Sequence, residues 1–273
     1  MPADELPPDA RSGPVASRPA VATEPTIPQH AEAGARRRLP LWLLTLAAGL
    51  VAGVISWAGG EATFDWFKLG DAMVYPPNYN QISGYQRMAV QAEVEGKARL
   101  VVERRKTVAA LGLLGLVLGV SLGLTGGLAR GGPRPALTGA ILGGVAGAAA
   151  GGGLSWALVP WFFRYEDPEG GGLLVLFLTH AGIFAGIGAA AGLALGVGLN
   201  DRTRLGRAFF GGLLGALIGT VAYEAVLATA FPLLRTYEPL STELVPRLLA
   251  HLLVAVCTAL LAGLAAGRSP RAS

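Results

Sequence analysis

The sequence predicts an all-α integral membrane protein, and three observations support this prediction. Of the 273 residues, 52% are hydrophobic and only 15% are charged, whereas soluble domains have roughly 25% charged residues. Apolar stretches long enough to cross a bilayer as helices recur along the chain. Most of the forty glycines lie inside those stretches, where membrane helices tolerate them. The single cysteine, Cys257, excludes an intrachain disulfide and multi-cysteine metal sites, and no cofactor is predicted.

Residues 1–39 are predicted to form a disordered tail. They contain seven prolines and no aromatic residue, so they bury too little apolar surface to offset the entropy of the chain. The apolar stretch 40–60, which follows the basic residues 36–38, is predicted to be the first membrane-spanning helix. A cleaved signal peptide is the alternative, but its basic region would begin only at Arg36, too late for a typical signal.

The segment 61–106 is predicted to lie outside the membrane. Ser83 and Gln86 have the spacing of a capping box, which predicts a helix over about 83–106. Three pairs of opposite charges four residues apart support this helix in water: Glu93/Lys97, Glu95/Arg99 and Arg99/Glu103. An apolar stripe on the same helix, expected to rest on a neighbouring segment or on lipid head groups, consists of Val90, Val94, Ala98 and Val101.

Residues 107–267 are predicted to form a membrane region of five helices, and 268–273 a short tail. By length and composition, the five spans are 107–129, 135–160, 172–199, 207–230 and 246–267. Cations near the ends of the spans predict a multi-pass protein of the cell membrane with both termini in the cytoplasm. The cytoplasmic side then holds ten arginines, namely Arg36, Arg37, Arg38, Arg130, Arg134, Arg202, Arg204, Arg207, Arg268 and Arg271, whereas the short loops opposite hold Arg164, Arg235 and Arg247. The seven cations of 61–106 oppose this orientation, because they lie on the other side.

Glycines at intervals of four residues (GxxxGxxxG) predict close helix packing and a tandem parallel repeat of two helices, 107–160 and 172–230. Residues four apart share one helix face, and without side chains they let two backbones approach closely. The spans are expected to contact the lipid bilayer, and the glycine faces could also bind a second copy of the chain or another membrane protein. The predicted packing glycines are Gly115, Gly119, Gly123, Gly139, Gly143 and Gly147 in the first copy, and Gly188, Gly192, Gly196, Gly211, Gly215 and Gly219 in the second.

Three ionisable residues lie well inside the predicted spans: His180, Glu224 and His251. Ionisable groups in a bilayer are costly and point to a functional site. The three residues lie at similar depths below the same surface, so they form a candidate polar or ion site, with pairing, proton transfer and metal binding as the alternatives.

The sequence favours a non-enzymatic structural or interaction role. The alternative is a small channel or transporter that uses the three polar residues, and an intramembrane enzyme comes third. One enzyme-like pattern, Gly153-Leu154-Ser155 with His251 as a base, lacks further supporting motifs. The glycine runs at 151–153 and 170–172 follow no predicted strand and lack the lysine of a phosphate-binding loop. The cations flank apolar segments and form no aromatic-interleaved patch, so nucleic-acid binding is not predicted.

Overall fold

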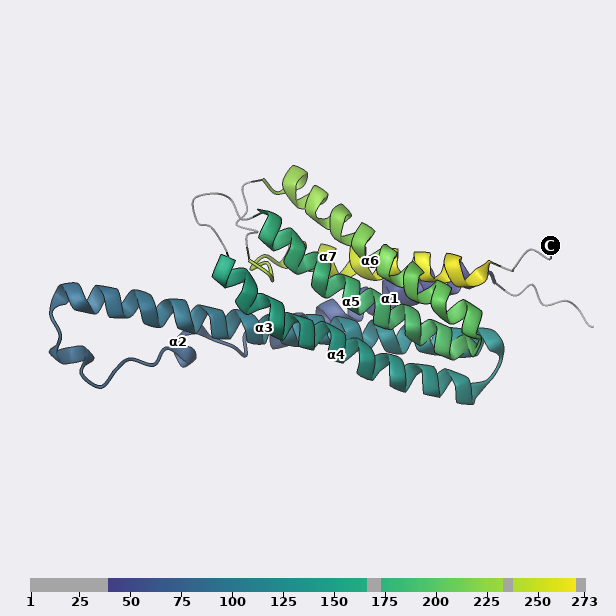
Figure 1. Ribbon diagram of the computed structural model, residues 1–273, viewed down its shortest axis with the longest axis horizontal. Coiled ribbons are helices and arrows are strands. Elements are labelled where there is room, and N and C mark those ends of the chain that lie inside the picture. Colours follow the sequence, from purple (N-terminus) through teal and green to yellow (C-terminus); the bar gives the residue numbers. More distant parts are fainter. Residues whose placement is uncertain (1–38, 166–172, 233–237, 269–273) are drawn as a thin grey trace, which may run out of the picture. The chain divides into compact units, whose positions relative to one another are not determined.

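A computed structural model describes residues 39–165, 173–232 and 238–268 (Figure 1). Within these residues all regular structure is helical, and six helices are long and apolar enough to span a membrane. The predicted all-α class is therefore confirmed, and the six apolar helices indicate a multi-pass membrane protein. The predicted tail 1–39, apart from Leu39, and the residues after Arg268 lie outside the described residues.

The helices largely follow the predicted spans. α4 continues past Pro160, and α6 begins five residues before 207 because the Asp201 carboxylate caps it, accepting from the backbone N–H groups of Thr203 at 2.9 Å and Arg204 at 3.3 Å. Two short helices, α2 (Leu69–Ala72) and the 3-10 helix η1 (Tyr79–Gln81), precede α3. The long helices are α1 (Leu41–Phe64), α3 (Gly84–Arg130), α4 (Pro133–Tyr165), α5 (Leu173–Leu199), α6 (Arg202–Ala230) and α7 (Leu244–Gly267).

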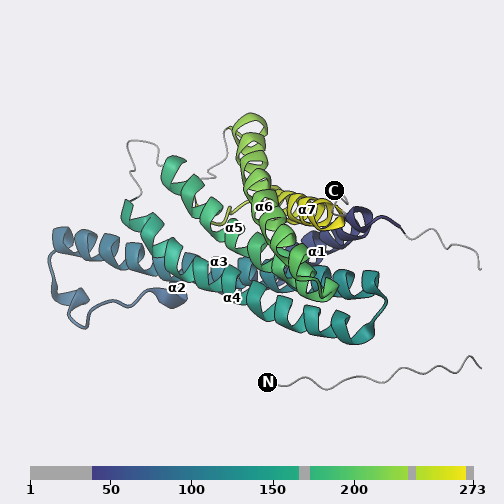
Figure 2. The ribbon, with the colours of Figure 1, turned by 45° about the vertical axis from the view of Figure 1, so that its right-hand side comes forward.

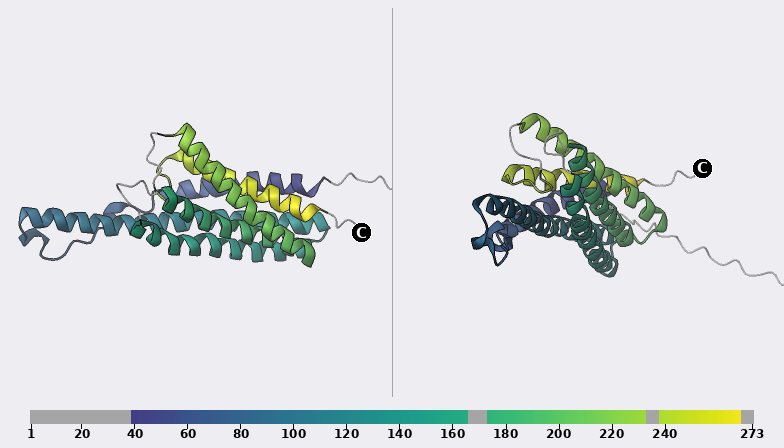
Figure 3. Two further views of the ribbon diagram at one scale, coloured as in Figure 1. Left: turned by 45° about the horizontal axis from the view of Figure 1, so that its top comes forward. Right: turned by 60° about the vertical axis from the view of Figure 1, so that its left-hand side comes forward.

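Helix α3 has 47 residues, about twice the length that a bilayer crossing needs. Its first part projects beyond the other long helices, and α2 lies beside it (Figure 1, Figure 3). From Ala98 on, α3 packs against the bundle, since Ala98 is buried and Arg99 lies over the Phe163 ring of α4. We call residues 65–106 the arm. The Ser83 side chain accepts from the Gln86 N–H and the Gln86 side chain accepts from the Ser83 N–H, so the predicted capping box is confirmed.

The arm is stabilised less by pairs within its helix than predicted. Of the three expected ion pairs, only Glu93–Lys97 forms, at 2.5 Å. Arg99 binds Glu238 instead, and Glu103 turns toward a backbone N–H outside the arm, because tertiary partners compete with helix neighbours. Val90, Val94 and Val101 of the apolar stripe line a cavity of about 600 Å³ together with residues of the returning segment 72–77. The stripe therefore rests on the arm itself.

The long helices pack as neighbours in a ring. α1 contacts α3, α3 contacts α5, α5 contacts α6, α6 contacts α7, and α7 contacts α1. α4 lies outside this ring, against α3 and α5 (Figure 2). The first residue of α1 and the last of α7 lie at one end of the bundle, which we call the tail end, since a Cβ at Gly267 would lie 3.9 Å from the Leu41 Cβ. We call the other end, where α1 stops and the arm begins, the arm end.

All twelve predicted packing glycines face helices of the same chain. In α3 the glycines at 115, 119 and 123 lie so close to the backbone of α4 that an added Cβ would collide with the carbonyl groups of residues 147, 143 and 139. In α5, Gly188 and Gly192 face the carbonyls of Gly212 and Ala208 in α6, and Gly196 faces Leu205. The α6 glycines at 211, 215 and 219 instead face α7, next to the carbonyls of Leu261, Cys257 and Leu253. These faces are therefore occupied within the bundle.

Candidate functional site

His180 and Glu224 lie together in the bundle, near its arm end. The His180 Nδ1 is 2.5 Å from the Glu224 Oε1, so the contact joins α5 to α6. The side chain of His180 is 3% exposed and that of Glu224 is 24% exposed. The imidazole stacks on Phe184 at 5.6 Å and meets the Tyr223 ring edge-on at 5.7 Å. The predicted clustering of these two residues is therefore present in the structure.

The second ring nitrogen of His180 binds the connection between α6 and α7. Nε2 lies 3.0 Å from the carbonyl oxygen of Pro239, and Pro239 belongs to a short segment, Glu238–Glu243, that we call the cap. Leu240 and Ser241 of the cap are buried, with 5% and 3% of their surfaces exposed. The imidazole thus holds α6 and the cap to α5 at the same time.

The arm holds the cap from another side. Arg99 Nη2 donates to Glu238 Oε1 at 2.5 Å, and the Leu240 N–H donates to Glu103 Oε1 at 3.0 Å. Glu103 is 7% exposed and lies just outside the apolar span that begins at Thr107. Burial, and after it the nearby Glu238 carboxylate, raises the pKa of Glu103 to about 7, although the Leu240 N–H, Lys106 and the Thr107 hydroxyl act in the opposite direction. Glu103 therefore releases its proton at a higher pH than an ordinary glutamate does.

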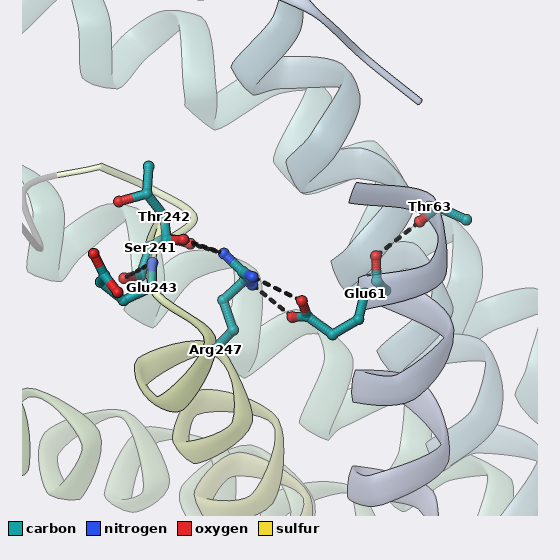
Figure 4. A network of polar contacts seen from close by, with 7 residues as sticks. Glu61, Thr63, Ser241, Thr242, Glu243 and Arg247 are labelled. Atoms are coloured by element: carbon teal, nitrogen blue, oxygen red, sulfur yellow. Dashed lines mark hydrogen bonds and ion pairs between the residues drawn. The ribbon is translucent and has the colours of Figure 1, made fainter. Parts of the chain in front are cut away.

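Arg247 of α7 is the most highly connected side chain at the arm end (Figure 4). Its guanidinium donates to both carboxylate oxygens of Glu61 in α1, at 2.6 and 2.7 Å. Nη1 donates to the backbone carbonyls of Ser241 at 2.9 Å and Thr242 at 2.6 Å. The Cζ also lies 3.9 Å from the centre of the Phe64 ring, a cation–π contact. Arg247, which is 6% exposed, therefore joins α1, α7 and the cap.

The third predicted site residue, His251, has a different partner. Its Nδ1 lies 2.9 Å from the Ser56 Oγ, and Ser56 also donates to the Gly53 carbonyl at 3.1 Å. Ser56 is 0% and His251 2% exposed. The structure therefore joins His180 to Glu224 and joins His251 to α1 instead.

Ser155, the serine of the enzyme-like pattern, donates to the Gly151 carbonyl of its own helix at 2.6 Å. The serine that contacts His251 is Ser56, and both side chains are enclosed between α1 and α7. A nucleophile must be within reach of its base and of a substrate. This arrangement gives no support to acyl transfer by Ser155 and His251.

The sequence did not predict Glu61, Glu103 or Arg247 as site residues. Each lies within a few residues of a predicted span end, where charged side chains are ordinary. The sequence does place Glu103 and Arg247 at the ends of two apolar spans on the same side of the membrane, and this shared position is the only feature that could have suggested a common site. Among the described residues, no group of three or more His, Cys, Asp or Glu side chains is arranged to hold a metal ion.

Comparison of the chain with protein-family models, with curated proteins and with solved structures found no match.

Proposed function

We propose that this chain is a non-enzymatic interaction protein of the membrane, in which the helix bundle anchors the arm and the arm binds another protein. The single observation that carries this proposal is the projection of α3. At about 1.5 Å per residue, Tyr85 lies roughly 33 Å along the helix from Thr107, where the apolar span begins. This distance places the end of the arm beyond the reach of lipid head groups.

The far end of the arm exposes apolar surface that the chain itself leaves uncovered. Tyr85 is 84% and Met88 62% exposed, and residues three apart share a helix face. Exposed aromatic residues and methionine are enriched at protein interfaces, whereas lysine and glutamate are depleted there. The exposed tyrosine and methionine are therefore typical of a surface that binds another protein.

Photocrosslinking tests the proposed role of the arm. A photoreactive phenylalanine analogue at Tyr85 or at Met88 is expected to give one discrete protein adduct in intact cells. The matched control is the same analogue at Lys97, whose exposed side chain points about 120° around the helix from Tyr85. Equal adducts at all three positions, or no adduct at Tyr85 and Met88, would contradict the proposal. The mass of the adduct distinguishes a second copy of the chain from a different protein.

We also propose that α3–α4 and α5–α6 are two copies of one glycine-zipper unit. Both units are hairpins with a short connection at the tail end, 131–132 and 200–201. Glycines repeat between them at an offset of 73 in the first helix (Gly115 and Gly188) and 72 in the second (Gly139 and Gly211). The copies differ in the second helix: the glycines at 139, 143 and 147 face the first helix of their own hairpin, whereas those at 211, 215 and 219 face α7. Since these faces are covered, the proposed partner binds at the arm and not at the glycines.

We further propose that both termini are cytoplasmic. The cations of the short loops support this orientation, with ten arginines at the tail end against three opposite, whereas the seven cations of 61–106 oppose it. Two of the tail-end arginines also bind helix ends: Arg130 donates to the Leu199 and Asn200 carbonyls, and Arg207 donates to the Arg268 carbonyl. In a Cys257→Ser background, a cysteine at Lys97 should react with an impermeant thiol reagent in intact cells. A cysteine at Arg202 should react only after lysis. The reverse pattern would reverse the orientation.

The channel or transporter alternative has one supporting observation, the partly exposed Glu224 against the buried His180. A transport site of this kind needs His180, Glu224 and His251 to converge, but His251 contacts Ser56 instead. A polar pair between two helices is a weaker basis for a transport path than three groups on one cavity. The interaction role is therefore the better supported of the two.

A further inference from the structure

The two contacts of His180 fix the number of protons that the site must hold. The Pro239 carbonyl oxygen can only accept a hydrogen bond, so His180 Nε2 must carry a proton to bind it. The other contact, between Nδ1 and Glu224 Oε1, joins two atoms that both have lone pairs. At 2.5 Å it requires one further proton between them, on the imidazole or on the carboxyl group.

Without that proton, His180 cannot keep both contacts at once. If Nε2 keeps its proton, the lone pair of Nδ1 faces the Glu224 carboxylate and the contact between α5 and α6 is repulsive. If the proton moves to Nδ1, the contact with Glu224 is kept, but the lone pair of Nε2 then faces the Pro239 carbonyl. The deprotonated site must therefore give up either Glu224 or the cap.

We propose that His180 and Glu224 form a proton-binding site, and that the bound proton holds the cap and α6 to α5 simultaneously. In the protonated state the pair has no net charge, whether it is imidazolium with carboxylate or imidazole with carboxylic acid. Proton exchange proceeds through Glu224, because its side chain is 24% exposed and that of His180 is 3% exposed. Release of the proton loosens the cap.

Two of the other charged groups around the cap are paired. On the α3 side, Glu238 is neutralised by Arg99, and on the α1 and α7 side, Arg247 is neutralised by Glu61. From α6, Tyr223 contacts the imidazole through its ring edge, and from α5, Phe184 stacks on it. Two further described carboxyl groups lie at the cap: Glu103, which accepts from the Leu240 N–H, and Glu243, which is exposed. A test must therefore separate proton loss at Glu103 from proton loss at His180 and Glu224.

The cap also connects the proposed proton site to the arm, because both bind its backbone. Its backbone is held by His180 of α5, by Glu103 in the first half of α3, and by Arg247 of α7. Loss of one of these three attachments lowers the protection of the cap against exchange with water. The proposed site thus links proton binding in the bundle to the base of the arm.

The substitution Glu224→Gln separates the proton from the contacts. A glutamine amide N–H can donate to His180 Nδ1 while Nε2 still donates to Pro239, so both contacts are kept at every pH. The reference protein is Glu103→Gln, because its amide oxygen still accepts from the Leu240 N–H but does not titrate. The comparison is between this variant and the double variant with Glu224→Gln, each as the full chain in lipid nanodiscs.

Hydrogen exchange of peptides covering 238–243 is measured from pH 5 to pH 9, and the two proteins are compared at each pH so that intrinsic exchange rates cancel. The two should exchange alike at the acidic end. Toward the alkaline end, the reference should exchange roughly tenfold faster than the double variant, as expected for the loss of one hydrogen bond. Equal exchange at every pH would overturn the proposal.

Nitrogen NMR of the reference protein, labelled at histidine, decides the matter if the double variant does not fold. The ring signals of His180 are assigned by comparison with His180→Gln. As the pH rises from 5 to 9, they should change from a ring in which both nitrogens carry or accept a proton to a ring in which only one does. The signals of His251, which contacts Ser56 and no carboxylate, serve as the internal comparison. Unchanged His180 signals from pH 5 to pH 9 would also overturn the proposal.

Discussion

Alanine at Gly147 is expected to destabilise the bundle severely, although it adds a single methyl group. The new Cβ would collide with the Gly115 carbonyl and lie 3.3 Å from the Gly115 Cα. Both obstacles are backbone atoms of α3, so no side-chain rotation can relieve the collision and the two helices must separate. Overpacking of this kind costs about 1–3 kcal/mol or more. We expect a lower thermal unfolding midpoint in detergent and a loss of monodisperse protein.

Gly153→Ala is the matched control for this experiment. Gly153 lies in the same helix, six residues further along, and a Cβ there would meet nothing within 4 Å. Alanine also favours helix over glycine by about 1 kcal/mol. The control should therefore be as stable as the parent protein or more stable. If Gly147→Ala and Gly153→Ala behave alike, close backbone contact between α3 and α4 does not stabilise the bundle.

The sequence predicted the six long helices well because their signal is local. A run of about twenty apolar residues is long enough to cross a bilayer as a helix, and it can be recognised without knowledge of its tertiary contacts. Helix ends were less accurate for the opposite reason. α1 extends past 60 to Phe64, and Glu61, within that extension, is bound by Arg247 from 186 residues away. A partner so distant in sequence cannot be inferred from local composition.

The candidate site was predicted in part. Depth in the membrane placed His180, Glu224 and His251 at similar levels, and two of the three do meet. Depth does not fix the direction in which a side chain points around its helix, so it could not separate Glu224, which faces α5, from His251, which faces α1. The contact of Glu103 with Leu240, 137 residues away, was missed because it depends on the path of the connection between α6 and α7.

Arg247→Gln is expected to produce the second large loss of stability. Removal of the guanidinium leaves the Glu61 carboxylate, with a side chain only 23% exposed, without its two donors, and leaves the Ser241 and Thr242 carbonyls without theirs. Breaking one side of a buried ion pair costs about 3–5 kcal/mol, mainly because the remaining charge stays buried and unpaired. The measurement is the free energy or midpoint of unfolding in detergent.

Three further variants test whether the unpaired charge is the cause. Glu61→Gln added to Arg247→Gln should restore part of the stability, since it removes the orphaned carboxylate, so the two losses should not add. Arg247→Lys should fall between the parent and Arg247→Gln, because an ammonium group cannot form two parallel bonds with a carboxylate. Lys97→Gln breaks the ion pair between Lys97 and Glu93, whose side chains are 75% and 64% exposed, and should leave the unfolding midpoint close to that of the parent protein, because water screens an exposed pair. Additive losses at positions 61 and 247, or an equal loss at Lys97, would show that burial of the Arg247–Glu61 pair does not set its contribution.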